Sequence, residues 1–247
     1  MGEASPLWAA VADPLLALLL APVCAACDAP LDFPTRGAVC ARCWDTIAPI
    51  TPPVCETCGD PLPSWRVISL EQARCPRCRR RPITLSKSRA VGVYDGALRE
   101  IIHALKYRGR RSLAAPLSAR MRQHGADVLA GADMVVPVPL HLSRLRARGF
   151  NQATDLARRL GLPCVKALRR RRRTPSQADL PAAQRHANVR GAFALRRRAR
   201  VRGLCVVLVD DVSTTGATLE ACAKVLKDAG AREVRALTAA RAVWRRR

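Results

Sequence analysis

The residues with the clearest chemical potential occupy one short segment near the end of the sequence. Residues 206–209 are apolar, Asp210 and Asp211 follow them, and residues 212–218 are rich in hydroxyl side chains and contain a glycine. This order predicts a buried strand, a tight loop and a helix over residues 217–229. Backbone N–H groups in such a loop, together with the helix dipole, favour a bound phosphate. Two acids at the carboxyl end of a strand suit ribose hydroxyls or a magnesium ion.

A phosphate beside acids that bind a diol indicates a phosphoribosyl ligand. We predict that Asp210 and Asp211 are the catalytic pair and hold the ribose hydroxyls, with magnesium on the pyrophosphate. The predicted 5′-phosphate cradle consists of the loop and the first residues of the helix: Ser213, Thr214, Thr215, Gly216, Ala217 and Thr218. The segment lacks the Gly-Lys-Ser/Thr of a Walker loop. A strand followed by solvated acids and an ordinary turn is the alternative, and the complete string disfavours it.

Cysteines form the second group of residues with predictable chemistry. The first part of the chain contains four Cys-x-x-Cys pairs: Cys24/Cys27, Cys40/Cys43, Cys55/Cys58 and Cys75/Cys78. Two such pairs complete a tetrahedral zinc site with four sulfur ligands, and the second spacing, C-x₂-C-x₁₆-C-x₂-C, is typical of a zinc ribbon. We therefore expect about two structural zinc ions, bound by sequential or by interleaved pairs. Disulfides, the main alternative, are disfavoured in the cytosol.

The charge of the chain is strongly positive and unevenly distributed. The formal net charge is +24, and residues 91–247 hold 33 Lys and Arg against 11 Asp and Glu, a difference of +22. Attraction to polyanions such as single-stranded DNA explains this excess. A GC-rich genome explains it equally well, because the chain contains 38 arginines and five lysines. With only 4% aromatic residues, few side chains are available to stack on bases.

The apolar segments indicate a protein that acts in the cytoplasm. No apolar run approaches the ~20 residues that span a membrane. Residues 7–21 predict a short apolar helix packed on the protein, and the acidic, non-basic start of the chain argues against a secretory signal. The expected localisation is cytoplasmic, without a membrane span.

The elements between these two groups predict an α/β domain. We expect a strand over 87–94, a helix from Gly96 to about Tyr107 capped by Asp95, and a second helix over about 112–124. A strand over 133–138 leads into a basic loop over 144–152 and then a helix over 151–160. Within this basic loop, Arg148 and Gly149 are candidates for holding a pyrophosphate, although a solvated connection is an equally good interpretation.

The later part of the chain completes the predicted sheet. Strands are expected over 164–168, 192–195, 204–210 and 233–239. The long polar segment 169–191 reads as a cationic lid that excludes water during a reaction. The predicted fold class is α/β with a mainly parallel sheet flanked by helices. The predicted domains are an N-terminal helix with a double zinc-ribbon module, residues 1–86, and a sheet domain, residues 87–247.

The motifs together resemble the ComF family of phosphoribosyltransferase-like proteins. The resemblance rests on the leucine-rich helix, the cysteine pairs and a series of short segments: Leu105-Lys106-Tyr107 with Gly109, Pro137-Val138-Pro139, Arg148–Gln152, Gln177, Arg185, Asn188, Ala192-Phe193 and Asp210–Thr218. It implies a type I phosphoribosyltransferase fold that binds phosphoribosyl pyrophosphate (PRPP). It also implies a link to the uptake of transforming DNA, with other DNA-uptake proteins as candidate partners.

Two functional hypotheses follow from these residues. In the first, the protein is a phosphoribosyltransferase whose acceptor no motif identifies. In the second, it is a non-catalytic sensor of PRPP or a nucleotide and binds single-stranded DNA through its basic surface. A closed acceptor pocket favours the first hypothesis, and an open basic groove favours the second.

Overall fold

The centre of the molecule is a four-stranded parallel sheet. The computed structural model describes residues 7–62, 73–80, 83–172 and 187–243, with the side chains of residues 7–11 left out. The strand order is β1-β6-β5-β2, and all three neighbouring pairs are parallel. These strands are β1 (Lys87–Val93), β6 (Glu233–Arg241), β5 (Cys205–Ser213) and β2 (Met134–Pro137). The predicted α/β class with a mainly parallel sheet is confirmed.

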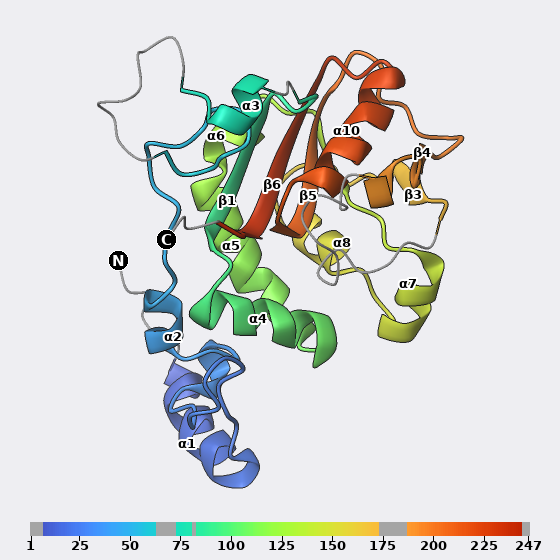
Figure 1. Ribbon diagram of the computed structural model, residues 1–247. Helices are drawn as coiled ribbons and strands as arrows, with labels where there is room; N and C mark the ends of the chain where they lie inside the picture. Colours follow the sequence, from blue (N-terminus) through green and yellow to red (C-terminus); the bar gives the residue numbers. More distant parts are fainter. Residues whose placement is uncertain (1–6, 63–72, 81–82, 173–186, 244–247) are drawn as a thin grey trace.

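Helices cover both faces of this sheet (Figure 1). Residues 206–209 of β5 are fully buried, which is typical of a parallel strand covered on two sides. Helix α10 (Ala217–Asp228) packs over one face, whereas α5 (Ala114–His124) and α8 (Gln152–Ala157) pack over the other. Two apolar cores result, one on each side of the sheet.

Helix α4 (Gly96–Tyr107) begins and packs as the sequence predicts. The carboxylate of Asp95 accepts a hydrogen bond from the N–H of Gly96 at 2.8 Å and caps the helix. The apolar side chains lie on one face and are buried: Leu98, Ile101, Ile102 and Leu105. The short elements η3 (Arg111–Leu113) and α6 (Ala126–Leu129) flank α5. Helix α4 thereby places Lys106 and Tyr107 near the carboxyl end of the sheet.

The predicted basic loop over 144–152 contains a helix, so that prediction was wrong in part. Helix α7 (Leu142–Arg148) begins where the Nδ1 atom of His141 accepts the N–H of Ser143 at 3.2 Å. It ends at Gly149, whose φ of 78° lies in the left-handed region that glycine adopts readily. The helical signal in the sequence is weak here, because α7 is short and its two leucines, Leu142 and Leu145, lie among arginines; both leucines are exposed.

The predicted strand over 164–168 also differs from the structure. Only Cys164 forms a bridge, to Val135 of β2, and the next strand is β3 (Leu168–Arg170). This strand pairs antiparallel with β4 (Phe193–Leu195) in a separate two-stranded sheet. Residues 169–170 of the predicted lid over 169–191 belong to β3, so that part of the lid prediction was wrong. Most of the remaining segment, including Gln177 and Arg185, lies outside the described residues.

The cysteine-rich part of the chain has two halves at opposite ends of the sheet (Figure 1). One half contains α1 (Leu7–Leu20), η1 (Pro34–Arg36) and α2 (Ala41–Asp45), and the other contains α3 (Pro76–Arg80). The segment between the halves lies along the edge strand β1, where the N–H of Val93 donates to the carbonyl of Ala48 at 2.9 Å. The domain boundary between residues 86 and 87 stays a prediction.

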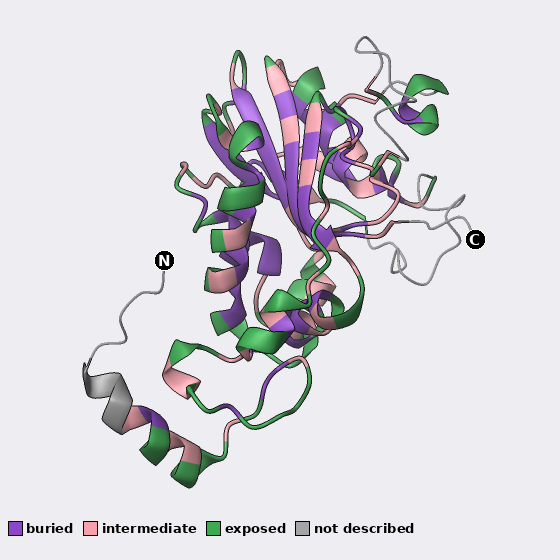
Figure 2. Cartoon of the chain, turned by 90° about the vertical axis from the view of Figure 1, so that its left-hand side faces the viewer, coloured by how far each residue is buried: buried purple, intermediate pink, exposed green. Residues whose placement is uncertain are grey.

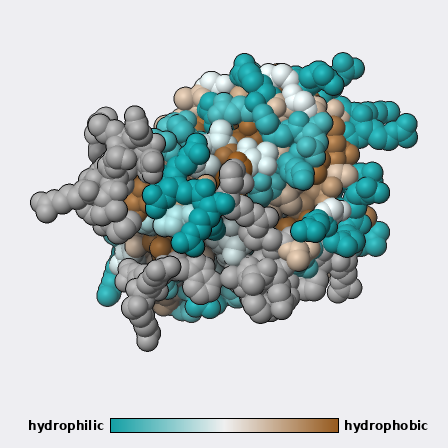
Figure 3. Space-filling view, turned by 45° about the horizontal axis from the view of Figure 1, so that its top comes forward, coloured by the Kyte–Doolittle hydropathy of each residue, from teal (hydrophilic) through white to brown (hydrophobic). Residues whose placement is uncertain are grey.

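Helix α1 projects from the rest of the protein. The expectation that this helix packs on the protein was wrong for its second half, because Leu18, Leu19 and Leu20 are 69–81% exposed. Figure 2 shows this exposed end, and Figure 3 shows the mixture of hydrophilic and apolar side chains on another face. Across the described ranges, no helix combines the length and apolar character needed to cross a membrane.

Candidate functional site

Residues 214–216, which we call the phosphate loop after the ligand that the sequence predicts there, form a turn between a strand and a helix as expected, with a longer strand before it. Strand β5 continues through Asp210 and Asp211 to Ser213, three residues past the predicted end. Gly216 then adopts a φ of 75° and α10 begins at Ala217, whose N–H lies 3.4 Å from the Oγ1 of Thr215. The first N–H groups of a helix have no partner within the helix and carry partial positive charge. The loop and the start of α10 therefore have the backbone features that favour a bound anion.

The two acids project from opposite faces of β5. Consecutive strand residues alternate in direction, and the buried residues before the acids obey this rule. Val207 and Val209 belong to the core under α5 and α8, whereas Leu208 belongs to the core under α10. Asp211 continues the first set and Asp210 the second. The structure thus places both acids at the carboxyl end of β5 but gives them different surroundings.

Asp211 forms a buried ion pair with Lys106 of α4. The Nζ atom of Lys106 lies 2.9 Å from Oδ2 of Asp211, and the two side chains are only 17% and 5% exposed. Burial alone lowers the pKa of Lys106, but the charge of Asp211 and its hydrogen bond outweigh burial, so the pKa is raised above its ordinary value. Lys106 therefore remains protonated and holds Asp211 in place.

The surroundings of Asp210 disfavour its charged form. Burial raises the pKa of its carboxyl group to about 8, and the negative charge of Asp211 contributes in the same direction. The positive charges of Lys106 and Arg170 oppose this rise. A carboxylate that is poorly stabilised without a ligand gains most from hydroxyl groups or a cation placed beside it. Asp210 is thus the acid better suited to bind a ligand directly.

A cavity of about 450 Å³ follows β2 and is rich in arginine. We call it the arginine cavity. Its basic lining residues are Arg111, Arg158, Lys166, Arg169, Arg170 and Arg196. Its one acidic lining residue among the described ones, Asp155, is bound by Arg111 at 2.8 Å and 2.9 Å. The cavity therefore presents an excess of positive charge and suits a polyanion.

The two residues that the sequence proposed for pyrophosphate have different positions relative to the arginine cavity. Gly149 lines it. Arg148 does not belong to the lining; its Nη1 donates to Oε1 of Gln152 at 2.6 Å, and its guanidinium stacks over the ring of Tyr107, 5.1 Å from the centroid. A role for either residue in binding pyrophosphate stays a prediction.

A second cavity, of about 860 Å³, adjoins the phosphate loop. We call it the junction cavity, because residues of the cysteine module and of the sheet domain both line it. Cys58 and Arg77 come from the module, and Ser213, Gly216 and Arg241 come from the sheet domain. The phosphate loop and Cys58 of the second group of cysteines therefore face one cavity.

Both groups of four cysteines have the geometry of a metal site. They consist of sequential pairs, Cys24/Cys27 with Cys40/Cys43 and Cys55/Cys58 with Cys75/Cys78, and the four sulfur atoms of each group lie within 4.8 Å of one another. Tetrahedral Zn–S bonds of about 2.3 Å require sulfurs about 3.8 Å apart, and the Cys27–Cys40 and Cys58–Cys75 sulfurs are 3.9 Å and 3.6 Å apart. The clusters therefore fit two structural zinc sites, and the interleaved pairing is excluded.

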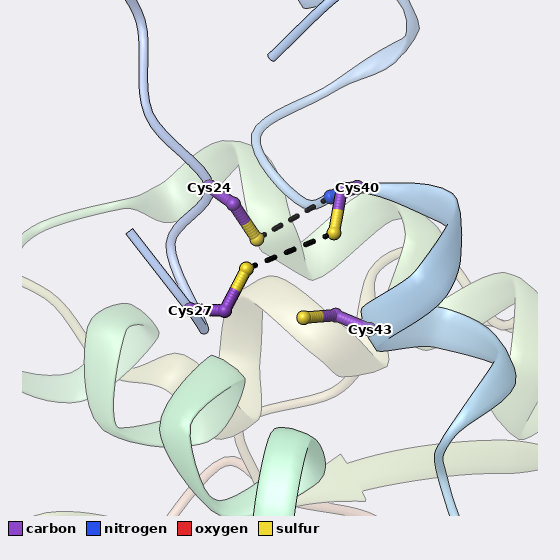
Figure 4. Close-up of side chains that lie close together, drawn as sticks. All are labelled: Cys24, Cys27, Cys40 and Cys43. Atoms are coloured by element: carbon purple, nitrogen blue, oxygen red, sulfur yellow. Dashed lines mark hydrogen bonds between the residues drawn. The ribbon is translucent and has the colours of Figure 1, made fainter. Parts of the chain in front are cut away.

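Figure 4 shows the first cluster, with four sulfur atoms directed toward a common centre. The N–H groups of Ala26 and Cys40 lie 3.4 Å from Sγ of Cys24 and stabilise a thiolate there. Four thiolates leave no open position on a zinc ion, which is typical of a structural site.

Three residues with structural links to the site were not singled out for it from the sequence. Lys106 was quoted only as part of a motif at the end of a helix, and nothing in its spacing indicated an ion pair with Asp211. Arg77 lies between two cysteine ligands and Arg241 ends the last strand. A buried position at the carboxyl end of β6, next to Ser213 in the sheet register, is the signal that identifies Arg241.

Comparison with protein families agrees with this division of the chain. The double zinc ribbon domain family matches residues 15–79, and the phosphoribosyl transferase domain family matches residues 145–245. The chain is thus a double zinc ribbon joined to a type I phosphoribosyltransferase fold.

Relatives align with most of the chain. DNA utilization protein YhgH of Salmonella typhi is 33% identical over 86% of this chain and 93% of its own length. Competence protein F of Haemophilus influenzae is 30% identical over 84% and 92%, and competence protein ComFC of Bacillus subtilis is 28% identical over 78% and 79%. The chain belongs to the ComF family, as its motifs indicated.

Proposed function

We propose that the protein binds PRPP at the phosphate loop and acts as a phosphoribosyltransferase in the cytoplasm. The observation that carries this proposal is the conjunction at the end of β5. An acid whose pKa is raised by burial, Asp210, precedes a loop that ends in a left-handed glycine at the start of α10. Asp210 and the loop are only a few residues apart in the sequence. One sugar phosphate could therefore place its phosphate on the loop and its ribose diol at Asp210.

The roles of the residues follow from their surroundings. The backbone N–H groups of residues 214–218 and the hydroxyls of Thr214, Thr215 and Thr218 bind the 5′-phosphate. Asp210 binds the ribose hydroxyls, and Asp211, held by Lys106, supports the same edge of the sheet. The carboxylate oxygens here are the hard ligands that magnesium prefers, and magnesium bound with PRPP neutralises the pyrophosphate.

Transfer of the phosphoribosyl group depends on positioning and charge. When pyrophosphate leaves, positive charge develops on the ribose, and a nearby carboxylate stabilises it. The basic residues of the arginine cavity provide a place for the departing pyrophosphate. The acceptor supplies the attacking atom.

The test is calorimetric titration with PRPP and magnesium. Wild-type protein should bind with a stoichiometry of one, and the Asp210→Asn variant, which keeps the ion pair of Lys106 with Asp211, should lose binding while its circular dichroism remains unchanged. Equal affinity in the folded variant would refute the site. Assay of pyrophosphate release with a panel of nucleobases then separates a transferase from a PRPP-binding sensor.

The arginine cavity and the names of the relatives support a second candidate function. Relatives are called DNA utilization and competence proteins, and the lining of this cavity is rich in guanidinium groups. We propose that single-stranded DNA binds there through its phosphates, in DNA uptake and with other uptake proteins as partners. Because arginine contacts go mainly to phosphates, sequence preference should be weak.

Salt dependence tests this second function. Each phosphate contact to a single strand contributes about −0.7 to the slope of log K against log salt. Changing Arg169, Arg170, Arg171 and Arg172 to serine should flatten the slope and weaken DNA binding. It should also weaken PRPP binding, because Arg169 and Arg170 line the cavity proposed for pyrophosphate. An affinity independent of salt would contradict the proposal. Genome composition would then be the better explanation of the arginine excess.

A further inference from the structure

A basic side chain from the second cysteine cluster reaches the phosphate loop. Arg77 lies between two ligands of this cluster on α3, and its Nη1 donates to the carbonyl oxygen of Thr215 at 3.0 Å. Its Nη2 lies 3.4 Å from Oδ2 of Asp60, and its side chain is 42% exposed along the junction cavity. A guanidinium has five N–H donors, so donors remain for a ligand in the cavity.

Two buried side chains that line the same cavity each have one polar atom without a hydrogen-bond partner among the described residues. Arg241 is 3% exposed; its Nε donates to Oδ1 of Asp60, whereas its Nη2 has no hydrogen-bond partner among the described residues. Ser213, also 3% exposed, has an Oγ that likewise lacks a partner in the described part of the chain. Unsatisfied buried donors are costly. Both groups are beside the phosphate loop, where a ligand oxygen would satisfy them.

The charge of the junction cavity favours an anion. Its basic lining residues are Arg77, Arg190, Lys224, Lys227 and Arg241, and its acidic lining residues are Glu220 and Asp228. Glu220 is already engaged, because it accepts hydrogen bonds from the N–H and the hydroxyl of Thr84 at 2.6–3.0 Å. Two guanidinium groups beside a helix N-terminus suit the two negative charges and three free oxygens of a phosphate monoester.

We propose that Arg77, Arg241 and Ser213 complete the phosphate site, so that the second cysteine cluster contributes directly to ligand binding. This inference rests on the proposed binding of a phosphoribosyl compound at the loop. The ligand group is a phosphate monoester. Asp60 orients both guanidinium groups, and metal bound by Cys75 and Cys78 fixes the short helix that carries Arg77.

A matched pair of variants on α3 tests the inference. Arg77→Gln removes the proposed phosphate contact, and Arg79→Gln removes an equal charge from an exposed residue that does not line the cavity. The ligand is ribose 5-phosphate, titrated by calorimetry, with ribose as the phosphate-free comparison. Arg77→Gln should weaken binding by about tenfold or more, the effect of losing a charge-assisted hydrogen bond, and Arg79→Gln should not. Elemental analysis should find the same zinc content in both variants.

The outcomes test the role of Arg77, the proposed function and the class of phosphate ligand separately. Equal affinities in the two variants would overturn the role of Arg77 and leave the phosphate loop as the site. No binding of ribose 5-phosphate to wild-type protein would overturn the proposed function together with this inference. Competition by an oligonucleotide that lacks a terminal phosphate would show that the site accepts phosphodiesters, and would overturn the assignment to a monoester.

Discussion

The two cysteine clusters have the same ligands but different relations to the rest of the molecule. In the first, Cys24 and Cys43 are buried in the same core as α4, whereas Cys27 is exposed. In the second, all four cysteines are buried, and Arg77 and Asp60 connect the cluster to Thr215 and Arg241. The first cluster therefore supports a helix, and the second supports the phosphate loop.

This difference indicates that the two halves of a double zinc ribbon can make different contacts with the domain that follows. The first cluster shares a core with α4, whose Lys106 pairs with Asp211. In the second cluster, Arg77 lies between two of the cysteines in the sequence and donates directly to the carbonyl oxygen of Thr215. Each zinc with four thiolates carries a net charge of about −2, so a guanidinium between the second cluster and a bound phosphate also separates two negative charges.

The largest expected effect is the loss of one metal ion, and variants that remove one cluster at a time distinguish the two clusters. Cys58→Ser and Cys24→Ser each remove a buried ligand, and each should lower the zinc content by about one ion per chain. Metal binding in such modules contributes on the order of 10 kcal/mol to folding. The Cys58 variant should lose PRPP binding, whereas the Cys24 variant should retain it in the folded fraction at reduced thermal stability. Elemental analysis with calorimetry measures both, and equal PRPP losses would remove the distinction.

A smaller effect is expected from the ion pair that the first cluster supports through α4. Lys106→Met leaves the carboxylate of Asp211 buried without its partner, which costs about 3–5 kcal/mol of unfolding free energy. Adding Asp211→Asn should recover much of the loss, because the buried charge is then absent. Urea denaturation of the single and double variants measures the coupling. Full additivity of the two changes would show that the pair does not interact.

The smallest effect concerns two glycines, one beside each half of the module. A Cβ on Gly59 would lie 2.5 Å from the carbonyl oxygen of Ser88 at a φ of +72°, and one on Gly92 would lie 2.8 Å from that of Ala48. Each alanine substitution should cost about 1–3 kcal/mol through overpacking. Gly59→Ala should also weaken PRPP binding, because it displaces the second cluster, and Gly92→Ala should not. Denaturation midpoints and calorimetry provide the two readouts.

The sequence predicted features that depend on neighbouring residues. The strand before Asp210, the loop around Gly216, the cap at Asp95 and the cysteine pairs all follow from local spacing. Features that depend on distant residues escaped prediction. The pair of Lys106 with Asp211 joins residues 105 positions apart, and the contact of Arg77 with Thr215 spans 138 positions. Helix α7 was missed because it has only seven residues, and two leucines among three arginines are too few to mark an apolar face.

The most direct test of the account is a crystal structure of the protein with PRPP and magnesium. The account predicts the 5′-phosphate within hydrogen-bond distance of the backbone N–H groups of residues 214–218, with the ribose hydroxyls on Asp210. It further predicts that the guanidinium groups of Arg77 and Arg241 contact the same phosphate. A phosphate bound elsewhere, with an empty loop after β5, would contradict the central claim.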